Sequence, residues 1–140
     1  MRVLLLIVTL SLSAAGYLFW KKADRLDANG FVTLPAADGH DDQHVYIVAP
    51  QNCPGDAAQR AEQMAGQLGI SGIPAVRTHS VDFSQLRAQA RANQLSESMI
   101  KQAQRMNDIM QGPLPIVFVR GRAKNNPAPE EVISEYKRTR

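Results

Sequence analysis

The segment from residue 45 to residue 68 changes from strand-like to helix-like patterning at Cys53, and this change constrains the fold more than any other feature. Residues 45–49 form a short apolar run rich in β-formers, which is typical of a strand buried on both faces. After Cys53, apolar side chains recur with the spacing of one face of an amphipathic helix. These helical positions are Ala57, Ala61, Met64, Ala65 and Leu68. The sequence therefore predicts a strand, a loop that carries Cys53, and a helix.

The rest of the chain continues this alternation of strand and helix patterns. Further strands are predicted at 74–78, at 115–119 and, more weakly, near Ala123. Helical spacing covers 83–110, with a break before its second half, and a last helix begins at Pro129. A helix joins the first two strands, so we expect them to be parallel. A tight turn joins the last two strands, so we expect them to be antiparallel.

Residues 3–20 are mostly apolar, and we predict that residues 1–22 form a membrane anchor. A helix over 3–20 spans roughly 27 Å at about 1.5 Å per residue, which is near the lower limit for crossing a bilayer. Aromatic side chains close the run, and Lys21 and Lys22 follow directly. Aromatic rings followed by cations suit the boundary between lipid tails and headgroups. The sequence therefore predicts a single-pass membrane protein.

Three topologies are compatible with this segment. A very short N-terminal tail before an apolar run is typical of a signal anchor that exports the rest of the chain. We therefore expect the domain on the exported side of the membrane, which is the periplasmic side in a bacterium. The small residues at 13–16 offer a signal-peptide cleavage site instead, which predicts a secreted domain. Lys21, Lys22 and Arg25 outnumber Arg2 and the amino terminus, and this count predicts a cytoplasmic domain.

Residues 23–43 are predicted to be a polar, turn-rich linker with a short extra edge strand at 31–34, and residues 44–140 a single domain. His40 and His44 have a His-x-x-x-His spacing, and aspartates lie beside them. Two histidines at this spacing converge on a metal ion only when a helix carries them. The turn-forming residues around them predict a loop, so no metal site is predicted.

The net charge of +3 comes from the membrane flank rather than from the domain. Residues 23–140 hold 13 basic and 13 acidic side chains, and this neutrality argues against a nucleic-acid partner. The charge is nevertheless uneven, because residues 23–76 carry a balance of −5 and residues 77–124 a balance of +5. Two interpretations are open: the two parts pair as solvated faces, or the basic part forms a rim for an anionic ligand.

Two motifs in the domain are similar to those of one family. In the first, residues 46–61 lead from a strand through Cys53-Pro-Gly-Asp56 into a helix that closes on Leu-Gly-Ile at 68–70. In the second, a Leu-Pro pair containing Pro115 opens an apolar strand. With the order of elements, these motifs resemble the thioredoxin-like superfamily, and most closely its glutaredoxin-type domains. Members of that family typically carry Cys-Pro-x-Cys at the first motif and a cis-proline at the second.

The resemblance covers roughly residues 44–138 and implies an α/β fold, a four-stranded mixed sheet flanked by helices, here preceded by the transmembrane helix. Asp56 replaces the second cysteine, so exchange between two thiols within the site is excluded. The Gly-Gly-x-Asp clasp that binds glutathione in the family falls near 125–130, which lacks both glycines. We therefore predict no bound cofactor, and glutathione in particular is disfavoured. The implied site residues are Cys53 as candidate nucleophile, Pro115 as candidate cis-proline, and Pro54, Asp56 and Leu114 for binding.

Two functions are compatible with this site. Unpaired backbone N–H groups and the helix dipole lower the pKa of a thiol at a helix N-terminus, whereas the like charge of Asp56 opposes the thiolate. If the thiolate is favoured, Cys53 is a monothiol that exchanges disulfides with protein partners, as a thiol–disulfide oxidoreductase does. If it is not, the chain is a non-catalytic binding module that holds a partner segment in a groove beside Pro115.

Overall fold

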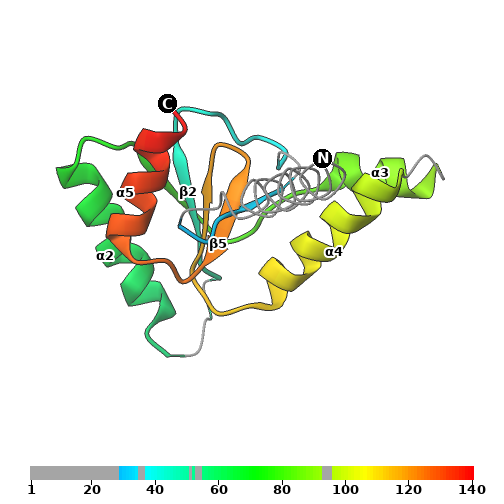
Figure 1. The fold of residues 1–140 in the computed structure, drawn as a ribbon. Helices are drawn as coiled ribbons and strands as arrows, with labels where there is room; N and C mark the ends of the chain where they lie inside the picture. Colours follow the sequence, from blue (N-terminus) through cyan, green and yellow to red (C-terminus); the bar gives the residue numbers. More distant parts are fainter. Residues whose placement is uncertain (1–28, 35–36, 51, 53–54, 93–95) are drawn as a thin grey trace, which may run out of the picture.

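The computed structural model describes residues 29–34, 37–50, 52, 55–92 and 96–140, which form an α/β domain (Figure 1). Along the chain the elements are β1 (Val32–Thr33), β2 (Val45–Val48), α2 (Ala57–Ile70), β3 (Ala75–Thr78), α3 (Ser84–Arg91), α4 (Glu97–Gln111), β4 (Ile116–Val119), β5 (Arg122–Asn125) and α5 (Pro129–Arg138). The predicted alternation of strands and helices is confirmed from residue 45 onward. The predicted anchor at 1–22 lies outside the described residues, and no helix within them is long and apolar enough to cross a bilayer.

In the described part of the chain, five strands form one mixed sheet, one strand more than the family resemblance implies. The strand order is β1-β5-β4-β2-β3. β2 and β3 are parallel and β4 and β5 are antiparallel, as their connections predict. The additional strand, β1, lies at one edge and pairs Val32 with Ala123 of β5. It corresponds to the extra edge strand predicted at 31–34.

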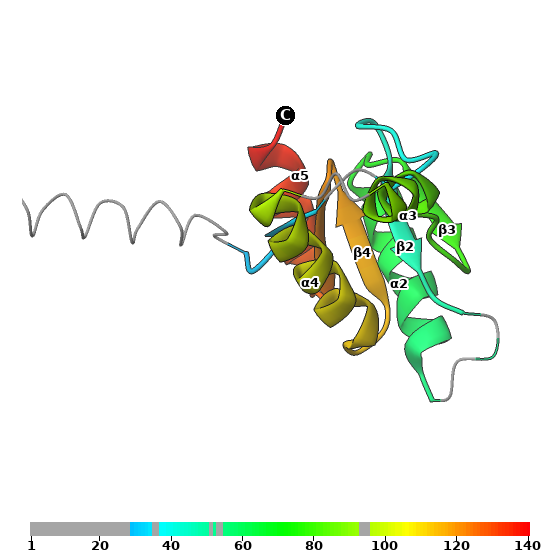
Figure 2. The same cartoon turned by 90° about the vertical axis from the view of Figure 1, so that its right-hand side faces the viewer.

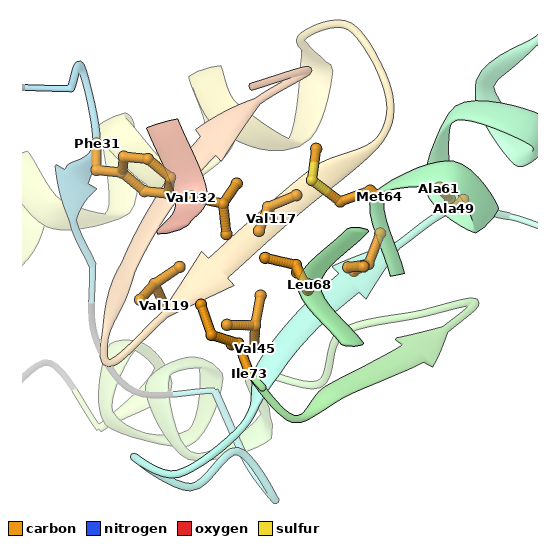
Figure 3. Packing of buried hydrophobic residues seen from close by; sticks show 11 residues of the cluster. Phe31, Val45, Ala49, Ala61, Met64, Leu68, Ile73, Val117, Val119 and Val132 are labelled. Carbon is orange, nitrogen blue, oxygen red and sulfur yellow. The ribbon is translucent and has the colours of Figure 1, made fainter. Parts of the chain in front are cut away.

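The central strands β2 and β4 send alternate side chains to the two faces of the sheet. One face, which includes Ile47 and Val117, packs against α2 and α5 (Figure 3). The other face, which includes Val48 and Ile116, packs against α4. Figure 2 shows α4 in front of the sheet and α2 and α5 behind it. The predicted apolar face of α2 is confirmed, since its buried residues are Ala57, Ala61, Met64 and Leu68.

Residues 29–34 belong to the domain, although the sequence places them in the linker. Phe31 and Leu34 are buried, one on each side of the sheet. Lys124 of β5 donates through Nζ to the carbonyl oxygen of Asn29 at 2.7 Å. The packed part of the chain therefore begins before the predicted boundary at residue 44.

A buried carboxylate joins this N-terminal segment to α5. Glu135 is fully buried and accepts hydrogen bonds from Arg138 Nη2 at 2.6 Å and from Asn29 Nδ2 at 3.2 Å. Arg122 Nε lies 3.2 Å from the same carboxylate. Burial raises the pKa of Glu135, but the hydrogen bonds from Arg138 and Asn29 and the charge of Arg122 outweigh burial, and the pKa lies below its usual value. Glu135 is therefore ionised at neutral pH.

The lowered pKa makes the Glu135 cluster sensitive to acid. Its stabilisation is present above the pKa of an unfolded glutamate, about 4.3, and is lost as the pH falls through the lower pKa of the folded state. We expect Glu135→Gln to be destabilised at about pH 7, and to lose less further stability than the wild type on going to about pH 3. Urea titrations at both pH values measure this difference. Equal losses in the two proteins would contradict it.

Two truncations on α2 test whether the helix packs by the observed face. Leu68 is fully buried, so Leu68→Ala is expected to lower the free energy of unfolding by about 2–5 kcal/mol. Ile70 lies on the same helix but is 90% exposed, so Ile70→Ala is expected to change stability by less than about 0.5 kcal/mol. Chemical denaturation measures both values. Similar losses in the two variants would rule out this packing.

Candidate functional site

Two segments far apart in the chain meet at one end of the sheet. Val48, the last residue of β2, pairs with Ile116, the first residue of β4. Arg60 of α2 donates through Nη2 to the carbonyl oxygen of Leu114 at 2.9 Å. The start of α2 and the turn that precedes β4 are therefore neighbours.

The predicted site residues fall partly within this region. Cys53 and Pro54 lie outside the described residues, whereas Asp56, Leu114 and Pro115 are described. The peptide bond between Leu114 and Pro115 is cis. Leu114 is half-buried, and Pro115 is buried and accepts a backbone hydrogen bond at 2.7 Å from the turn after β5. This turn thus lies at the edge of the core, with the Leu114 side chain partly open to solvent.

Asp56 occupies the N-cap position of α2, but its side chain makes no capping hydrogen bond. Its carboxylate pairs instead with Arg60, with Nη1 lying 2.8 Å from Oδ1. Since the same guanidinium binds Leu114, Arg60 bridges the first turn of α2 to the turn before β4. A positive charge therefore faces the negative charge that Asp56 brings to the helix start. The pair therefore leaves the first turn of α2 without a net side-chain charge at these two positions.

Arg60 is a residue of the site that the sequence analysis does not predict. Asp56 and Arg60 are four residues apart, a spacing at which side chains meet on a helix, so their pairing had a signal in the sequence. Leu114, by contrast, is 54 residues from Arg60. No local pattern indicates that contact, because only the packing of α2 beside β4 creates it.

His79 is a second residue at this end of the sheet for which the sequence predicts no role. It follows β3, and its Nδ1 lies 3.0 Å from the carbonyl oxygen of Ala49, just after β2. A carbonyl oxygen only accepts hydrogen bonds, so Nδ1 is the donor in this contact. Parallel strands end at the same edge of a sheet, and this rule provides the signal that places His79 beside the loop after β2.

Asn125 of β5 holds the turn before β4 on the side opposite Arg60. Its Nδ2 donates to the carbonyl oxygens of Ile109 at 2.6 Å and of Pro113 at 3.1 Å. Gly112 lies against this side chain, since a Cβ at Gly112 would come within 2.6–2.7 Å of Asn125 atoms. The turn is therefore held between Arg60 on one side and Asn125 on the other.

The segment that carries His40 and His44 forms a folded loop. The His40 ring stacks on Tyr46 with centroids 3.8 Å apart, and burial lowers its pKa although Asp41 acts in the opposite direction. Asp41 accepts hydrogen bonds from the backbone N–H groups of Gln43 and His44, at 2.9 and 2.8 Å. These bonds, led by the one from His44, hold the pKa of Asp41 below its usual range. Among the described residues, no group of three or more side chains is arranged to hold a metal ion.

Most of the cations in the basic part of the chain, residues 77–124, form ion pairs. Five of its eight cations face a carboxylate, and two of those carboxylates belong to α5. The pairs are Arg77–Glu62, Arg87–Asp82, Lys101–Glu97, Arg122–Glu135 and Lys124–Glu131. These ion pairs argue against a free basic rim, but only Arg77–Glu62 joins the basic part to the acidic part at 23–76, so the predicted pairing of the two parts is not the pattern observed.

A double-mutant cycle tests the contact between Gly112 and Asn125 at the turn before β4. Gly112→Ala is expected to cost about 1–3 kcal/mol of stability, because its Cβ would clash with Asn125. In an Asn125→Ala background the clash disappears, and the same substitution is expected to be nearly neutral. The coupling between the two positions should exceed about 0.5 kcal/mol in urea titrations. Additive losses would show that the two residues do not touch.

Comparison with protein-family models, with curated proteins and with solved structures finds no match to the chain. The contacts around the turn before β4 are therefore the basis on which a function can be assigned. They place the Asp56–Arg60 ion pair beside the half-buried Leu114, at the end of the sheet where His79 contacts Ala49.

Proposed function

We propose that the chain is a membrane-tethered, thioredoxin-like protein whose Cys53 is a monothiol that exchanges disulfides with protein partners. The observation that carries the proposal is the contact between Arg60 and Leu114 at 2.9 Å. This contact joins the start of α2 to the turn before β4, the two segments from which the family resemblance builds its site. The strand order β3-β2-β4-β5, with α2 and α5 on one face and α4 on the other, supports the same fold.

The electrostatics of the helix start favour a reactive thiol. The dipole of α2 stabilises a thiolate near its N-terminus. The opposing charge of Asp56 is compensated by Arg60, whose Nη1 lies 2.8 Å from the carboxylate. With the charge of Asp56 compensated, the helix dipole is the larger effect, and it favours the thiolate form of Cys53.

The proposed reaction conserves the number of disulfides. The Cys53 thiolate attacks one sulfur of a partner disulfide, a bond forms between the two sulfurs, and the partner's own S–S bond breaks. The second partner sulfur leaves as a thiolate and takes up a proton. Because Cys53 is the only cysteine of the sequence, a thiol of another molecule resolves the mixed disulfide.

A second function, a non-catalytic binding module that uses the groove beside Pro115, is supported by the role of position 56. Where a dithiol site has its second sulfur, this chain has a carboxylate engaged in an ion pair with Arg60. Such a pair stabilises the local structure without any redox step. In this alternative, the half-buried Leu114 contacts the partner segment.

Alkylation of the full chain separates the two functions, because its single cysteine makes Cys53 the only thiol that reacts. If Cys53 exchanges disulfides, the pH at which the alkylation rate reaches half its maximum is expected to lie below about 8.5, the pKa of an unperturbed thiol. Asp56→Asn is expected to lower this midpoint, and Arg60→Gln to raise it by leaving Asp56 unpaired. Each shift should be on the order of one pH unit or less.

Glu62→Gln provides the matched control for this experiment. It removes one negative charge from the same helix, but at an exposed position where the partner is Arg77. Its alkylation midpoint is expected to equal that of the wild type. A wild-type midpoint near that of a free thiol, unmoved by either Asp56→Asn or Arg60→Gln, would overturn the exchange function and leave the binding module.

A further inference from the structure

The N-terminal end of the domain lies against the last turns of α5. Asn29 Nδ2 donates to Glu135 Oε2 at 3.2 Å and to Ser134 Oγ at 3.4 Å. Its carbonyl oxygen accepts from Lys124 Nζ at 2.7 Å. The chain therefore enters the domain beside the C-terminal end of α5, and this point is held by side chains from α5 and β5.

Four cations gather at that end of α5. We name Arg120, Lys137, Arg138 and Arg140 the α5 basic group. Lys137, Arg138 and Arg140 are exposed, and the Arg120 guanidinium lies 4.3 Å from the ring centre of Tyr136 and donates to the Tyr136 carbonyl oxygen at 3.0 Å.

The acids near the α5 basic group leave it with a net positive charge. Glu135 pairs with Arg138, but it is fully buried and also faces Arg122. Asp42, whose carbonyl oxygen accepts from Arg120 Nε at 2.8 Å, and Asp41, which lines the same cavity as Arg120, bring two exposed carboxylates to the margin of the group. With Glu135 they offset three of its four positive charges. Lys137 and Arg140 have no ion-pair partner within the described part of the chain.

The tether in the proposed function is short. Six residues, 23–28, separate Lys22 from Asn29. Even a fully extended chain spans at most about 3.5 Å per residue, so Asn29 lies within about 25 Å of the headgroup boundary. The tether therefore keeps the α5 basic group, which adjoins Asn29, within reach of the bilayer surface.

From these contacts we infer that the α5 basic group binds the anionic headgroups of the membrane that anchors the chain. The inference rests on the proposed tether. Exposed cations next to a membrane are attracted by anionic lipids within about a Debye length of the surface.

Binding through the α5 basic group orients the candidate site away from the membrane. β4 runs from Ile116, next to the site, to Val119, and Arg120 of the basic group follows at its other end. Figure 1 shows the C-terminal end of α5 at the opposite end of the sheet from the connection between α4 and β4. In this orientation, the protein partner of the proposed function approaches the site from the aqueous side.

The test uses the full chain in lipid nanodiscs made either of phosphatidylcholine alone or of phosphatidylcholine with phosphatidylglycerol. Hydrogen exchange of the backbone amides at 135–140 is the readout. With phosphatidylglycerol, exchange there is expected to slow by up to about fivefold for each cation that binds headgroups, since about 1 kcal/mol of binding to the folded helix end lowers the population of its locally open state by that factor. High salt is expected to remove the difference.

Two charge-reversal variants sharpen this test. Lys137→Glu combined with Arg140→Glu is expected to abolish the lipid-dependent slowing. Arg91→Glu combined with Arg105→Glu makes the same change in charge at exposed positions of α3 and α4, away from Asn29, and is expected to preserve it. Because each variant is compared between the two lipids, a general loss of stability does not imitate the result.

Three outcomes overturn the inference. Equal exchange in both lipids, with the chain still embedded, removes the headgroup contact and leaves the tether and the thiol chemistry intact. Slowing in phosphatidylcholine on addition of inorganic phosphate assigns the group to soluble anions instead. Release of the full chain from both nanodiscs disproves the tether itself, while alkylation of Cys53 still tests the proposed exchange separately.

Discussion

The antiparallel pairing of β2 with β4 is the interaction on which the rest of the structure depends. These strands lie at the centre of the sheet, and Ile47 is paired with Val117 in a fully buried position. A shift of one residue would turn every side chain of a strand to the opposite face. Packing against α2 and α5 on one side and α4 on the other therefore holds a single register. The same register brings the end of β2 beside the start of β4.

The candidate site results from that register and from one bridging side chain. Arg60 binds both Asp56 and Leu114, so it joins α2 to the turn before β4 and also balances the charge at the helix start. The negative charge of Asp56 at the helix start is thus compensated by its neighbour on the helix. Asn125 holds the same turn from β5, and the backbone around Leu114 is fixed from two sides.

The two ends of the sheet differ in chemistry. One end holds the Asp56–Arg60 pair and His79, beside the loop after β2. The other end holds the cations that adjoin the last turn of α5, close to the point where the chain enters the domain. The two ends therefore present different side-chain chemistry to their surroundings. This polarity arises because β4 connects the two ends directly.

The sequence alone predicted β2 from an apolar run and α2 and α5 from the spacing of their apolar residues, because both patterns are local properties of the chain. The sequence also predicted which strands are parallel, since connection length limits strand direction. Only the tertiary structure decided that Phe31 is a core residue, because a strand as short as β1 has no period and is buried by pairing with β5. The contact of Arg60 with Leu114 likewise spans 54 residues. Such contacts depend on how packed elements approach one another, and no spacing along the chain encodes that approach.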